Sequence, residues 1–430
     1  MRILVLGGTG LIGSSVVARL ISVGHEVVGL ARDVRDGALR LPEAQWVAID
    51  LAELRDARSW LPHLSGIDAV VNCAGILQDA PGDSTHAAHV SAITGLSLAC
   101  EEVGIRRFIQ LSAIGVDRDA PSAFSATKRD GDAVLMARDL DWVVLRPSVV
   151  VGRRAYGGSA LFRGLAGLPI LPVLPDTGPL QVVQLDQVIE TILFFLTPGA
   201  PSRLILDLVG PDRLSMTDIV RRYRRWLGWG EPILLSMPRW AGTFLFRLGD
   251  FAGLLGWRPP IRSTAQKEMA RGAVGDPSAW IKATGITPIA LDAALVAEPA
   301  AVQERWFAVL YVLKPVLFTV FSLFWIITGL LSIGPGYQIG VAMMEEGGAG
   351  ELSAPSVIAG GLADLIIGLG IAFRRTTRIA LLAALGISLF YALAGTLILP
   401  RLWIDPLGPM LKIWPIIVLN LIALGILRDR

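Results

Sequence analysis

The feature that most constrains this fold is a set of four long apolar stretches near the C-terminal end. They are Phe307 to Ile333, Val357 to Phe373, Ile379 to Leu399 and Ile413 to Leu427. A helix needs about 20 residues to cross a hydrocarbon core of about 30 Å. The fourth stretch is short, so we expect its helix either to begin near Pro409 or to be tilted in the bundle. Helices of a soluble bundle would need a polar stripe that faces water, and these stretches have almost none. The sequence therefore predicts four membrane-spanning helices.

Loop charges predict the orientation of these helices, because Lys and Arg are enriched in cytoplasmic loops. Basic residues lie before the first stretch, between the second and third, and after the fourth: Arg305, Arg374, Arg375, Arg378, Arg428 and Arg430. The first loop contains Glu345, Glu346 and Glu351 but no basic residue, whereas the last loop, with Arg401 and Lys412, fits the pattern less well. The apolar run at the N-terminus is too short for a secretory signal. We expect a multi-pass protein of the cytoplasmic (inner) membrane, with the N-terminal region and both termini in the cytoplasm.

Composition narrows the class of protein further. Hydrophobic residues make up 53% of the 430 residues and charged residues 18%, which disfavours disorder. The 39 Lys and Arg residues nearly cancel the 37 Asp and Glu residues, so we expect no nucleic-acid partner. Cys73 and Cys100 cannot build a disulfide framework. The four histidines form no ligand cluster, so we expect no metal site, and we expect surface or helix-cap roles for His86 and His89.

The N-terminal region alternates short apolar runs with longer amphipathic segments, a pattern typical of an α/β domain. The runs are Ile3 to Leu6, Glu26 to Leu30, Gln45 to Ile49, Ala69 to Asn72, Phe108 to Leu111 and Trp142 to Leu145. Such alternation predicts a doubly wound parallel sheet of the Rossmann type, with ligands at the carboxyl ends of its strands. We expect three regions: this domain over 1–150, a substrate-side and connecting region over 151–300, and the four-helix transmembrane domain over 301–430.

A glycine-rich turn follows the first apolar run. It consists of Gly7, Gly8, Thr9, Gly10, Leu11, Ile12 and Gly13. Glycines with this spacing allow a tight turn, a close approach of the backbone to a pyrophosphate, and close packing of the following helix. Because the turn joins a predicted strand to a predicted helix, we expect Gly7, Thr9, Gly10, Leu11, Ile12 and Gly13 to bind a nicotinamide nucleotide.

Three further strand ends complete the predicted nucleotide site. Arg32 follows the second apolar run directly and would favour the 2′-phosphate of NADP, although the adjacent Asp33 leaves NAD as the alternative. Asp50 and Leu51 follow the third run, where they would meet the adenine; a helix N-cap is the alternative for Asp50. The fourth run ends in a segment placed near the middle of the cofactor, namely Cys73, Ala74 and Gly75.

These motifs resemble a known family. Together with Leu111-Ser112-Ala113 and Arg146-Pro147-Ser148, they are similar to an atypical, extended short-chain dehydrogenase/reductase, above all to the nucleotide-binding accessory subunit of respiratory complex I. The residues Glu304 to Phe307 and Trp403 to Pro409 resemble the DoxX-like membrane domain that is sometimes fused to such reductases.

The resemblance implies a set of catalytic positions. Active members of the family use a Ser, a Tyr and a Lys; Ser112 matches the serine, and Lys128 matches the lysine that binds the nicotinamide ribose. Phe124 stands where the family has its tyrosine, and phenylalanine has no proton to give. Tyr156 would replace it only if the fold brings it near. The residues alone leave other roles open: Ser112 as a turn cap, and Lys128 as a solvated helix residue.

Two functions follow from this reading. The first is a membrane-anchored NAD(P)-binding oxidoreductase that acts on a lipophilic substrate, such as a quinone or an isoprenoid. The alternative is a non-catalytic nucleotide-binding scaffold or redox sensor in a membrane complex, because Phe124 replaces the catalytic tyrosine. Residues 239–257 are typical of an interfacial helix or of a buried one. Asp364, inside the second stretch, is either a proton or headgroup site or a structural hydrogen-bond partner.

Overall fold

The computed structural model of the chain describes residues 1–80 and 82–427, so that Arg428 and Arg430 lie outside the described residues. The chain divides into two compact units. The first consists of Met1–Asp250 with Pro259–Ala308, and the second of Phe251–Arg258 with Val309–Arg430. Each unit is described by itself below.

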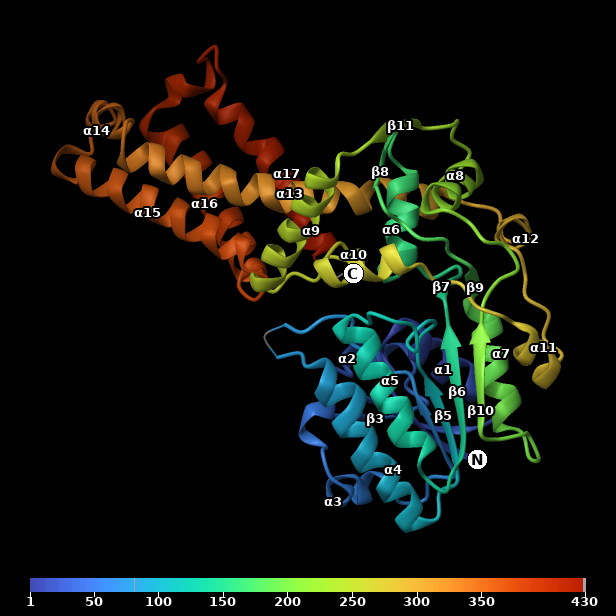
Figure 1. Ribbon diagram of the computed structural model, residues 1–430. Coiled ribbons are helices and arrows are strands. Elements are labelled where there is room, and N and C mark those ends of the chain that lie inside the picture. The colour runs from blue at the N-terminus through green and yellow to red at the C-terminus, as the bar shows by residue number, and fades with distance from the viewer. Residues whose placement is uncertain (81, 428–430) are drawn as a thin grey trace. The chain divides into compact units, whose positions relative to one another are not determined.

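The first unit is built on a seven-stranded sheet in which every pair of neighbouring strands is parallel (Figure 1). The strands in spatial order are β10 (Leu204–Leu208), β6 (Asp141–Pro147), β5 (Arg107–Leu111), β4 (Ala69–Asn72), β1 (Arg2–Leu6), β2 (Glu26–Ala31) and β3 (Gln45–Ala48). The chain order reverses between β1 and β4. This reversal is the switch point at which a doubly wound sheet binds its ligand, and the predicted Rossmann-type fold is confirmed.

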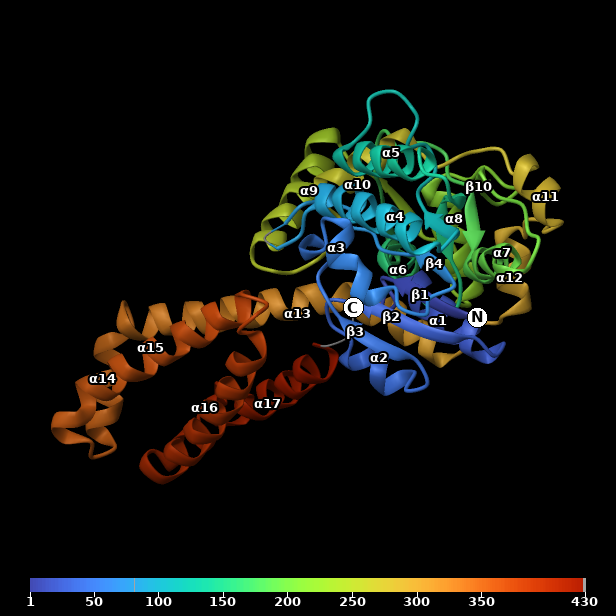
Figure 2. The same ribbon diagram turned by 90° about the horizontal axis from the view of Figure 1, so that it is seen from below.

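Helices cover both faces of this sheet, so each face has its own core. On one face, Ile3 and Val5 pack against residues of α1 (Leu11–Ser22) and α7 (Leu185–Leu196). On the other face, Leu4 and Leu6 belong to a core with α3 (Ala57–Trp60), α4 (Ala92–Val103) and α5 (Ala123–Met136). Alternating side chains of one strand thus serve both cores, which explains why the strands are continuously apolar. Figure 2 shows α4 and α5 side by side.

Short elements connect these layers and follow them. The connecting elements of the sheet are α2 (Arg35–Arg40), the 3-10 helices η1 (Leu51–Glu53) and η2 (Leu61–His63), and the π-helical turn η3 (Ala87–Ser91). After β6, β7 (Val149–Val151) pairs with β9 (Val182–Gln184), and β8 (Ile170–Val173) pairs with β11 (Ile233–Ser236). The helices of this later region are α6 (Gly157–Ala166), α8 (Met216–Trp226), α9 (Arg239–Leu254), α10 (Ser263–Arg271), α11 (Ser278–Thr284) and α12 (Leu291–Ala297).

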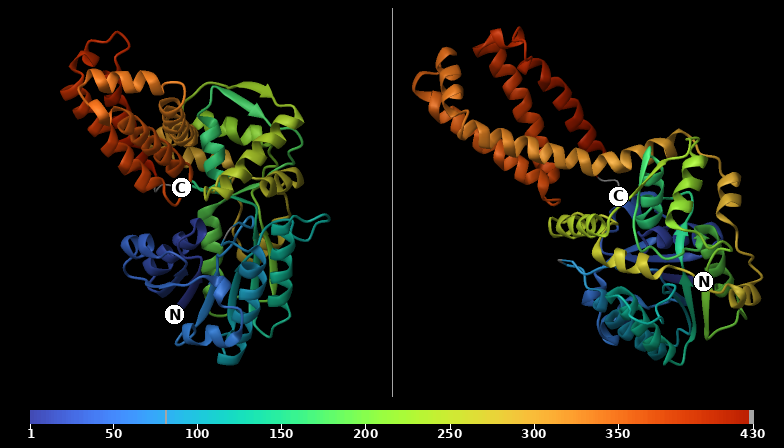
Figure 3. Two further views of the ribbon diagram at one scale, coloured as in Figure 1. Left: turned by 90° about the vertical axis from the view of Figure 1, so that its left-hand side faces the viewer. Right: turned by 45° about the horizontal axis from the view of Figure 1, so that its top comes forward.

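The second unit contains the four predicted spans, and all four are helices long and apolar enough to cross a membrane. They are α13 (Val302–Ile333), α15 (Ser353–Ala372), α16 (Thr377–Ile398) and α17 (Pro409–Ile426), the last beginning at Pro409 as predicted. Between them in the chain lie α14 (Tyr337–Glu346), η4 (Gly350–Leu352) and η5 (Pro400–Trp403). The helices of this unit are the orange and red ribbons of Figure 3. Side chains from all four spans form one core, including Trp325, Ile371, Leu381 and Ala423.

Small residues let two of these spans approach closely. A Cβ built on Gly329 of α13 would lie 2.5 Å from the carbonyl oxygen of Gly361 in α15. A Cβ on Gly368 would lie 2.6 Å from the backbone nitrogen of Ile326. Such contacts are typical of helices that pack in lipid, where hydrophobic burial between helices contributes little. At one end of the bundle, Arg401 forms a bidentate ion pair with Glu346 (Nε–Oε1 2.6 Å), which joins the first and last loops.

Candidate nucleotide and active site

The glycine turn after β1 has the geometry of a phosphate cradle. Gly7 has a φ of +69°, and the backbone nitrogens of Gly7 and Gly8 donate to the carbonyl oxygen of Leu30 on β2. A Cβ on Gly13 would lie 2.1 Å from the oxygen of Gly7, and a Cβ on Gly7 would lie 2.9 Å from the backbone of Ala74. A side chain at Gly7 or Gly13 would collide with backbone, since the start of α1, the turn and the end of β4 meet here. The N-terminus of α1 at the half-buried Gly10 therefore fits a nucleotide pyrophosphate.

The adenine side of the predicted site contains charged groups that are already paired. The Arg32 guanidinium forms an ion pair with Asp83 and bonds the oxygen of Gly82, while its side chain is still 40% exposed. Asp50 is the N-cap of η1 and accepts a hydrogen bond from Ala52 N (3.0 Å), which is the alternative weighed from the sequence. Leu51 follows in η1 and is half-buried. The roles of these residues toward the nucleotide stay predictions.

The end of β4 is held by buried polar contacts. Asn72 donates to Gln110 Oε1 on β5 (2.8 Å) and accepts from the backbone nitrogen of Ala74 (3.0 Å). The backbone nitrogen of Cys73 donates to the carbonyl oxygen of Leu6 on β1, and burial raises the pKa of the Cys73 thiol to about 12. A thiol of this kind stays protonated and is not a nucleophile. Cys73, Ala74 and Gly75 thus present a fixed backbone beside the glycine turn.

Lys128 lies at the ends of β4 and β5, and the structure does not support the solvated role that the sequence left open for it. Its side chain is buried, and Nζ donates to the carbonyl oxygens of Leu111 (2.8 Å) and Ala74 (3.1 Å). The ammonium group therefore joins the ends of β4 and β5. Burial lowers the pKa of Lys128 to about 8, partly offset by the carboxylate of Asp132. Gly75 is adjacent, since its Cβ would lie 3.4 Å from Nζ.

Ser112, which follows β5, donates a short hydrogen bond to Asp132 Oδ2 (2.5 Å). Asp132 comes one turn after Lys128 on α5, so both side chains share a face of that helix. Its carboxylate is fully buried, and this burial raises the pKa of Asp132 to about 6, against the opposing effects of Ser112, Lys128 and Arg146. Asp132 Oδ1 has no hydrogen-bond partner among the described residues. The buried hydrogen bond between Ser112 and Asp132 was not predicted from the sequence, although the four-residue spacing from Lys128 could have indicated it.

Phe124 occupies the position of the family's tyrosine and packs edge-on against His89 (ring centroids 5.7 Å apart). The predicted surface or cap role of His89 is wrong, because the ring is buried in the π-helical turn η3 under α5. The backbone nitrogen of Ile76 donates to Nε2 (3.0 Å), so Nδ1 carries the proton and donates to Thr127 Oγ1 (2.9 Å). Burial and the neighbouring Lys128 lower the pKa of His89 to about 2. His89 therefore stays neutral and cannot replace the missing tyrosine as an acid.

Two residues of α10 also reach the start of α5. Ser125, next to Phe124, donates to Glu268 Oε1 (2.9 Å) and accepts from Arg271 Nη1 (2.7 Å). Arg271 also pairs with Glu268 (3.1 Å). These contacts join positions more than 140 residues apart in the sequence, so no local pattern could have predicted them. Tyr156, by contrast, is the half-exposed N-cap residue of α6.

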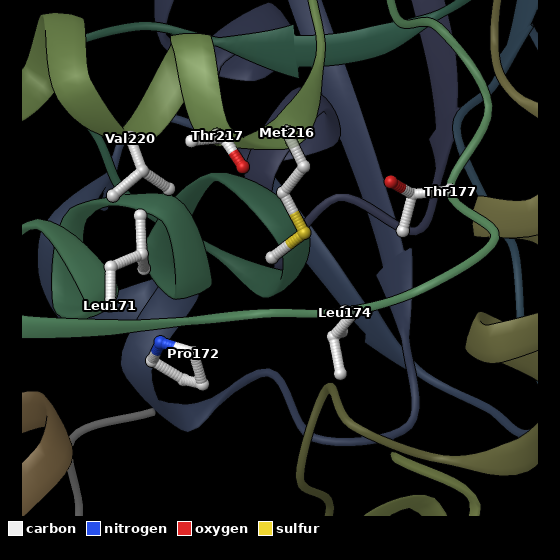
Figure 4. A pocket seen from close by; sticks show the side chains of 7 residues that line it. All are labelled: Leu171, Pro172, Leu174, Thr177, Met216, Thr217 and Val220. Carbon is white, nitrogen blue, oxygen red and sulfur yellow. The ribbon is translucent and has the colours of Figure 1, made fainter. Parts of the chain in front are cut away.

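A small cavity between β8 and α8 is not a substrate site. Figure 4 shows its lining, which consists of Leu171, Pro172, Leu174, Thr177, Met216, Thr217 and Val220. Its volume is ≈ 10 Å³, which is room for about one water molecule.

In the membrane unit, the Tyr391 hydroxyl donates to Asp364 Oδ1 (3.1 Å), as the structural alternative for Asp364 requires.

The parallel sheet with its switch point, the glycine cradle and the buried Lys128 define an NAD(P)-binding Rossmann domain. Comparisons with known proteins agree. Residues 7–161 match a family model described as NAD(P)H-binding, and residues 322–421 match the DoxX-like family. The chain thus combines an NAD(P)-binding domain of the short-chain dehydrogenase/reductase type with a C-terminal DoxX-like domain that has four candidate membrane spans.

Relatives are known that match more than half of the chain. An uncharacterized protein of Mycobacterium tuberculosis (strain ATCC 25618 / H37Rv) is 27% identical over 242 residues, which cover 56% of this chain and 25% of that protein. The ceramide reductase of Caulobacter vibrioides is 23% identical over 54% of this chain and 73% of the reductase. A structure of UDP-glucuronic acid 4-epimerase from Bacillus cereus in complex with NAD shares the fold, with a TM-score of 0.54 and 18% identity over 72% of this chain and 100% of the epimerase.

Proposed function

We propose that this chain is a membrane-anchored oxidoreductase that uses a nicotinamide nucleotide to reduce a lipophilic substrate, such as a quinone or an isoprenoid carbonyl. The observation that carries the proposal is the buried Lys128, which lies beside Gly75 and donates to the carbonyl oxygens of Ala74 and Leu111, the residue before Ser112. The same chain also has four candidate membrane spans. The similarity to a ceramide reductase, whose name states a lipid substrate, supports the same substrate class.

Each residue has a defined part in this reaction. A bound nicotinamide nucleotide would supply the hydride. Lys128, fixed between the ends of β4 and β5, would contact the nicotinamide ribose, and the glycine turn with the N-terminus of α1 would hold the pyrophosphate. Ser112 orients the acceptor oxygen of the substrate through its hydroxyl group. Phe124 forms an apolar wall at the place where a tyrosine would act.

The proton comes from Asp132 through Ser112. In the acid form of Asp132 the hydrogen bond with Ser112 would reverse, so that the carboxyl group donates to Ser112 Oγ and the Ser112 hydroxyl is free to donate to the substrate. As the substrate carbon is reduced, the acceptor oxygen would take the hydroxyl proton of Ser112, and Ser112 would take the proton of the Asp132 carboxyl group. The products are a neutral hydroxyl on the substrate, a restored Ser112 and an Asp132 carboxylate. Lys128 and Arg146, whose Nε lies 3.9 Å from Asp132 Oδ2, stabilise that carboxylate.

Turnover assays test this function directly. Purified full-length protein is incubated with NADPH or NADH and a panel of quinones, enones and ketones, and nucleotide oxidation is measured. We expect substrate-dependent oxidation that Phe124→Tyr raises, because the tyrosine hydroxyl adds a second proton donor. Phe194→Tyr, at a half-buried phenylalanine of α7, is the control and should leave the rate unchanged. Bound nucleotide without oxidation in either form would favour the alternative of a scaffold or redox sensor in a membrane complex, which the absence of the tyrosine also suggests.

We propose NADP as the preferred nucleotide, because Arg32 lies at the end of β2 with a side chain that is still 40% exposed. Its partner Asp83 would be exchanged for the 2′-phosphate, a stronger bidentate acceptor. Arg32→Ala should raise the Kd for NADPH about tenfold more than the Kd for NADH, equivalent to about 1.4 kcal/mol. Titration of both nucleotides measures this difference, and Arg40→Ala, an exposed arginine of α2, is the control. Equal weakening of both nucleotides would show that Arg32 does not select NADP.

The proposal includes the place of the protein in the cell. We propose that the chain resides in the cytoplasmic membrane with both termini and the nucleotide domain in the cytoplasm, where nicotinamide nucleotides are available. In this arrangement residues 1–150 bind the nucleotide, residues 151–300 contribute the substrate side, and residues 301–430 anchor the chain in the bilayer. The alternation of basic and acidic loops supports this orientation.

A further inference from the structure

Helix α9 is apolar on two opposite faces, although only one of them is covered by protein. The covered face consists of Gly242, Phe246, Gly249 and Gly253. A Cβ on Gly249 would lie 1.6 Å from the carbonyl oxygen of Ile261, so the helix backbone rests directly on the segment that follows it. This close approach fixes the rotation of α9 about its own axis. It therefore also fixes which side chains point outward.

The outward face is a continuous stripe of large apolar side chains. They recur at helical spacing and are all exposed: Trp240 (73%), Phe244 (59%), Leu248 (47%), Phe251 (58%) and Leu254 (69%). Burial of one such side chain contributes about 1.5–3 kcal/mol, so a face of five left in water forfeits a large stabilisation. Contiguous exposed patches of this kind mark membrane or protein contact sites.

The C-terminal end of α9 identifies the lipid bilayer as the occupant of this face. Immediately after α9, the Trp257 indole donates to the carbonyl oxygen of Ala372, the last residue of α15 (2.8 Å). The backbone nitrogen of Arg374 donates to Leu255 O (2.9 Å), and the Arg374 guanidinium lies over the Trp257 ring. The Trp257 ring also contacts Phe318 of α13 (centroids 5.0 Å apart). The helix thus ends where a predicted span leaves the membrane, at the level where Trp and Arg side chains anchor proteins to the bilayer surface.

We propose that α9 is an interfacial helix whose outward face lies in the headgroup region of the leaflet at which α15 ends. Arg247, exposed on the same face, extends its charged end toward anionic headgroups while its methylene groups stay with the apolar stripe. The contact also has a connection to the nucleotide site. Asp250 of α9 accepts from Gln78 Nε2 (2.9 Å), and Gln78 follows Gly75 in the segment after β4. The lipid contact needs no turnover, so it is independent of the proposed reaction.

Photocrosslinking tests the proposal in the full-length protein. The photoreactive residue p-benzoylphenylalanine is placed at Phe244 or Phe251 in protein reconstituted into vesicles of phosphatidylethanolamine and phosphatidylglycerol. Mass spectrometry then identifies what each site captures after illumination. The substitution preserves an aromatic side chain, so the fold should be retained. We expect phospholipid adducts at both sites.

Two control sites make the outcome decisive. Leu389, exposed on α16, should capture lipid in the same vesicles, and Leu39, exposed on α2, should capture none. Crosslinks from Phe244 to a second copy of the chain would overturn the proposal in favour of an interface between copies. Crosslinks to a span of the same chain would overturn it in favour of an internal contact. Failure of Phe244 and Phe251 to capture lipid while Leu389 does so would also overturn it.

Discussion

At the residue scale, Gly13 is the position in the glycine turn where the backbone leaves least room for a side chain. The carbonyl oxygen of Gly7 occupies the place of its Cβ at 2.1 Å, and both atoms belong to the cradle that would hold the pyrophosphate. Gly13→Ala must therefore move the start of α1 away from the turn. We expect the Kd for the nucleotide to rise at least tenfold, about 1.4 kcal/mol, in a calorimetric titration. Gly230→Ala, where no atom lies within 4 Å of the added Cβ, is the control. Unchanged affinity in Gly13→Ala would place the pyrophosphate elsewhere.

Asp132 gives the site a defined pH dependence. Burial raises the pKa of this carboxyl group to about 6, so the acid form that donates a proton is present below pH 6 and is lost above it. We expect the rate of substrate reduction to fall as the pH rises through about 6, because fewer molecules carry the proton that Ser112 passes on. Stopped-flow measurement of nucleotide oxidation between pH 5 and pH 8 records this profile.

Two variants test the assignment of this profile. Asp132→Asn should abolish the decline near pH 6 and lower the rate at pH 5 at least tenfold, while nucleotide binding, measured separately, is retained. Asp130→Asn, at an exposed carboxylate two residues earlier on α5, should keep the profile of the unmodified protein. A decline that persists in Asp132→Asn would mean that another group supplies the proton.

At the scale of single elements, the sequence predicted what depends on local pattern. The apolar runs gave the strands, because both faces of a parallel strand are buried. The shortness of the fourth apolar stretch indicated a helix that begins near Pro409, which is the first residue of α17. The surface or cap role expected for His89 was wrong for a reason that lies outside η3. A Cβ on Gly131 of α5 would lie 2.0 Å from the His89 oxygen, so α5 covers this turn closely. The contacts of Ser125 with Glu268 and Arg271 depend on α10, which lies far along the chain, so no spacing in the sequence could predict them.

The hydrogen bond between α15 and α16 yields a prediction at the same scale. Asp364 is buried in the bundle and accepts from the Tyr391 hydroxyl (3.1 Å). Polar contacts between helices in lipid contribute about 0.6 to 1.7 kcal/mol. A double-mutant cycle of Asp364→Asn and Tyr391→Phe, followed by unfolding in detergent, should give a coupling free energy of about 1 kcal/mol. The cycle contains its own control, because each single variant corrects for effects on packing. Additive losses, with coupling near zero, would remove the structural role and return Asp364 to the functional alternative.

At the scale of the whole molecule, the two parts of the chain use glycine for different purposes. In the nucleotide-binding domain, the glycines would let the backbone approach a charged ligand, whereas in the membrane domain Gly329 and Gly368 bring helix backbones close to each other. The two parts also differ in charge, and the average composition conceals this, because the formal net charge of +2 combines a charged region with a nearly uncharged one. The position of residues along the chain was therefore more informative than their proportions.

Topology can be measured on the intact molecule by cysteine labelling. The loop with Glu345 has no basic residue, and the ion pair between Arg401 and Glu346 joins it to the last loop, so we expect both loops outside the cytoplasm. Glu345→Cys should react with a membrane-impermeant maleimide in intact cells, because this side chain is exposed. Leu39→Cys, exposed on α2 of the nucleotide-binding domain, should react only after the membrane is broken. The native Cys73 and Cys100 lie in the same domain and provide a background that the unmodified protein measures. If Leu39→Cys reacted in intact cells and Glu345→Cys reacted only after the membrane is broken, the nucleotide site would lie outside the cytoplasm, away from its cofactor. That result would contradict the proposed function together with the topology.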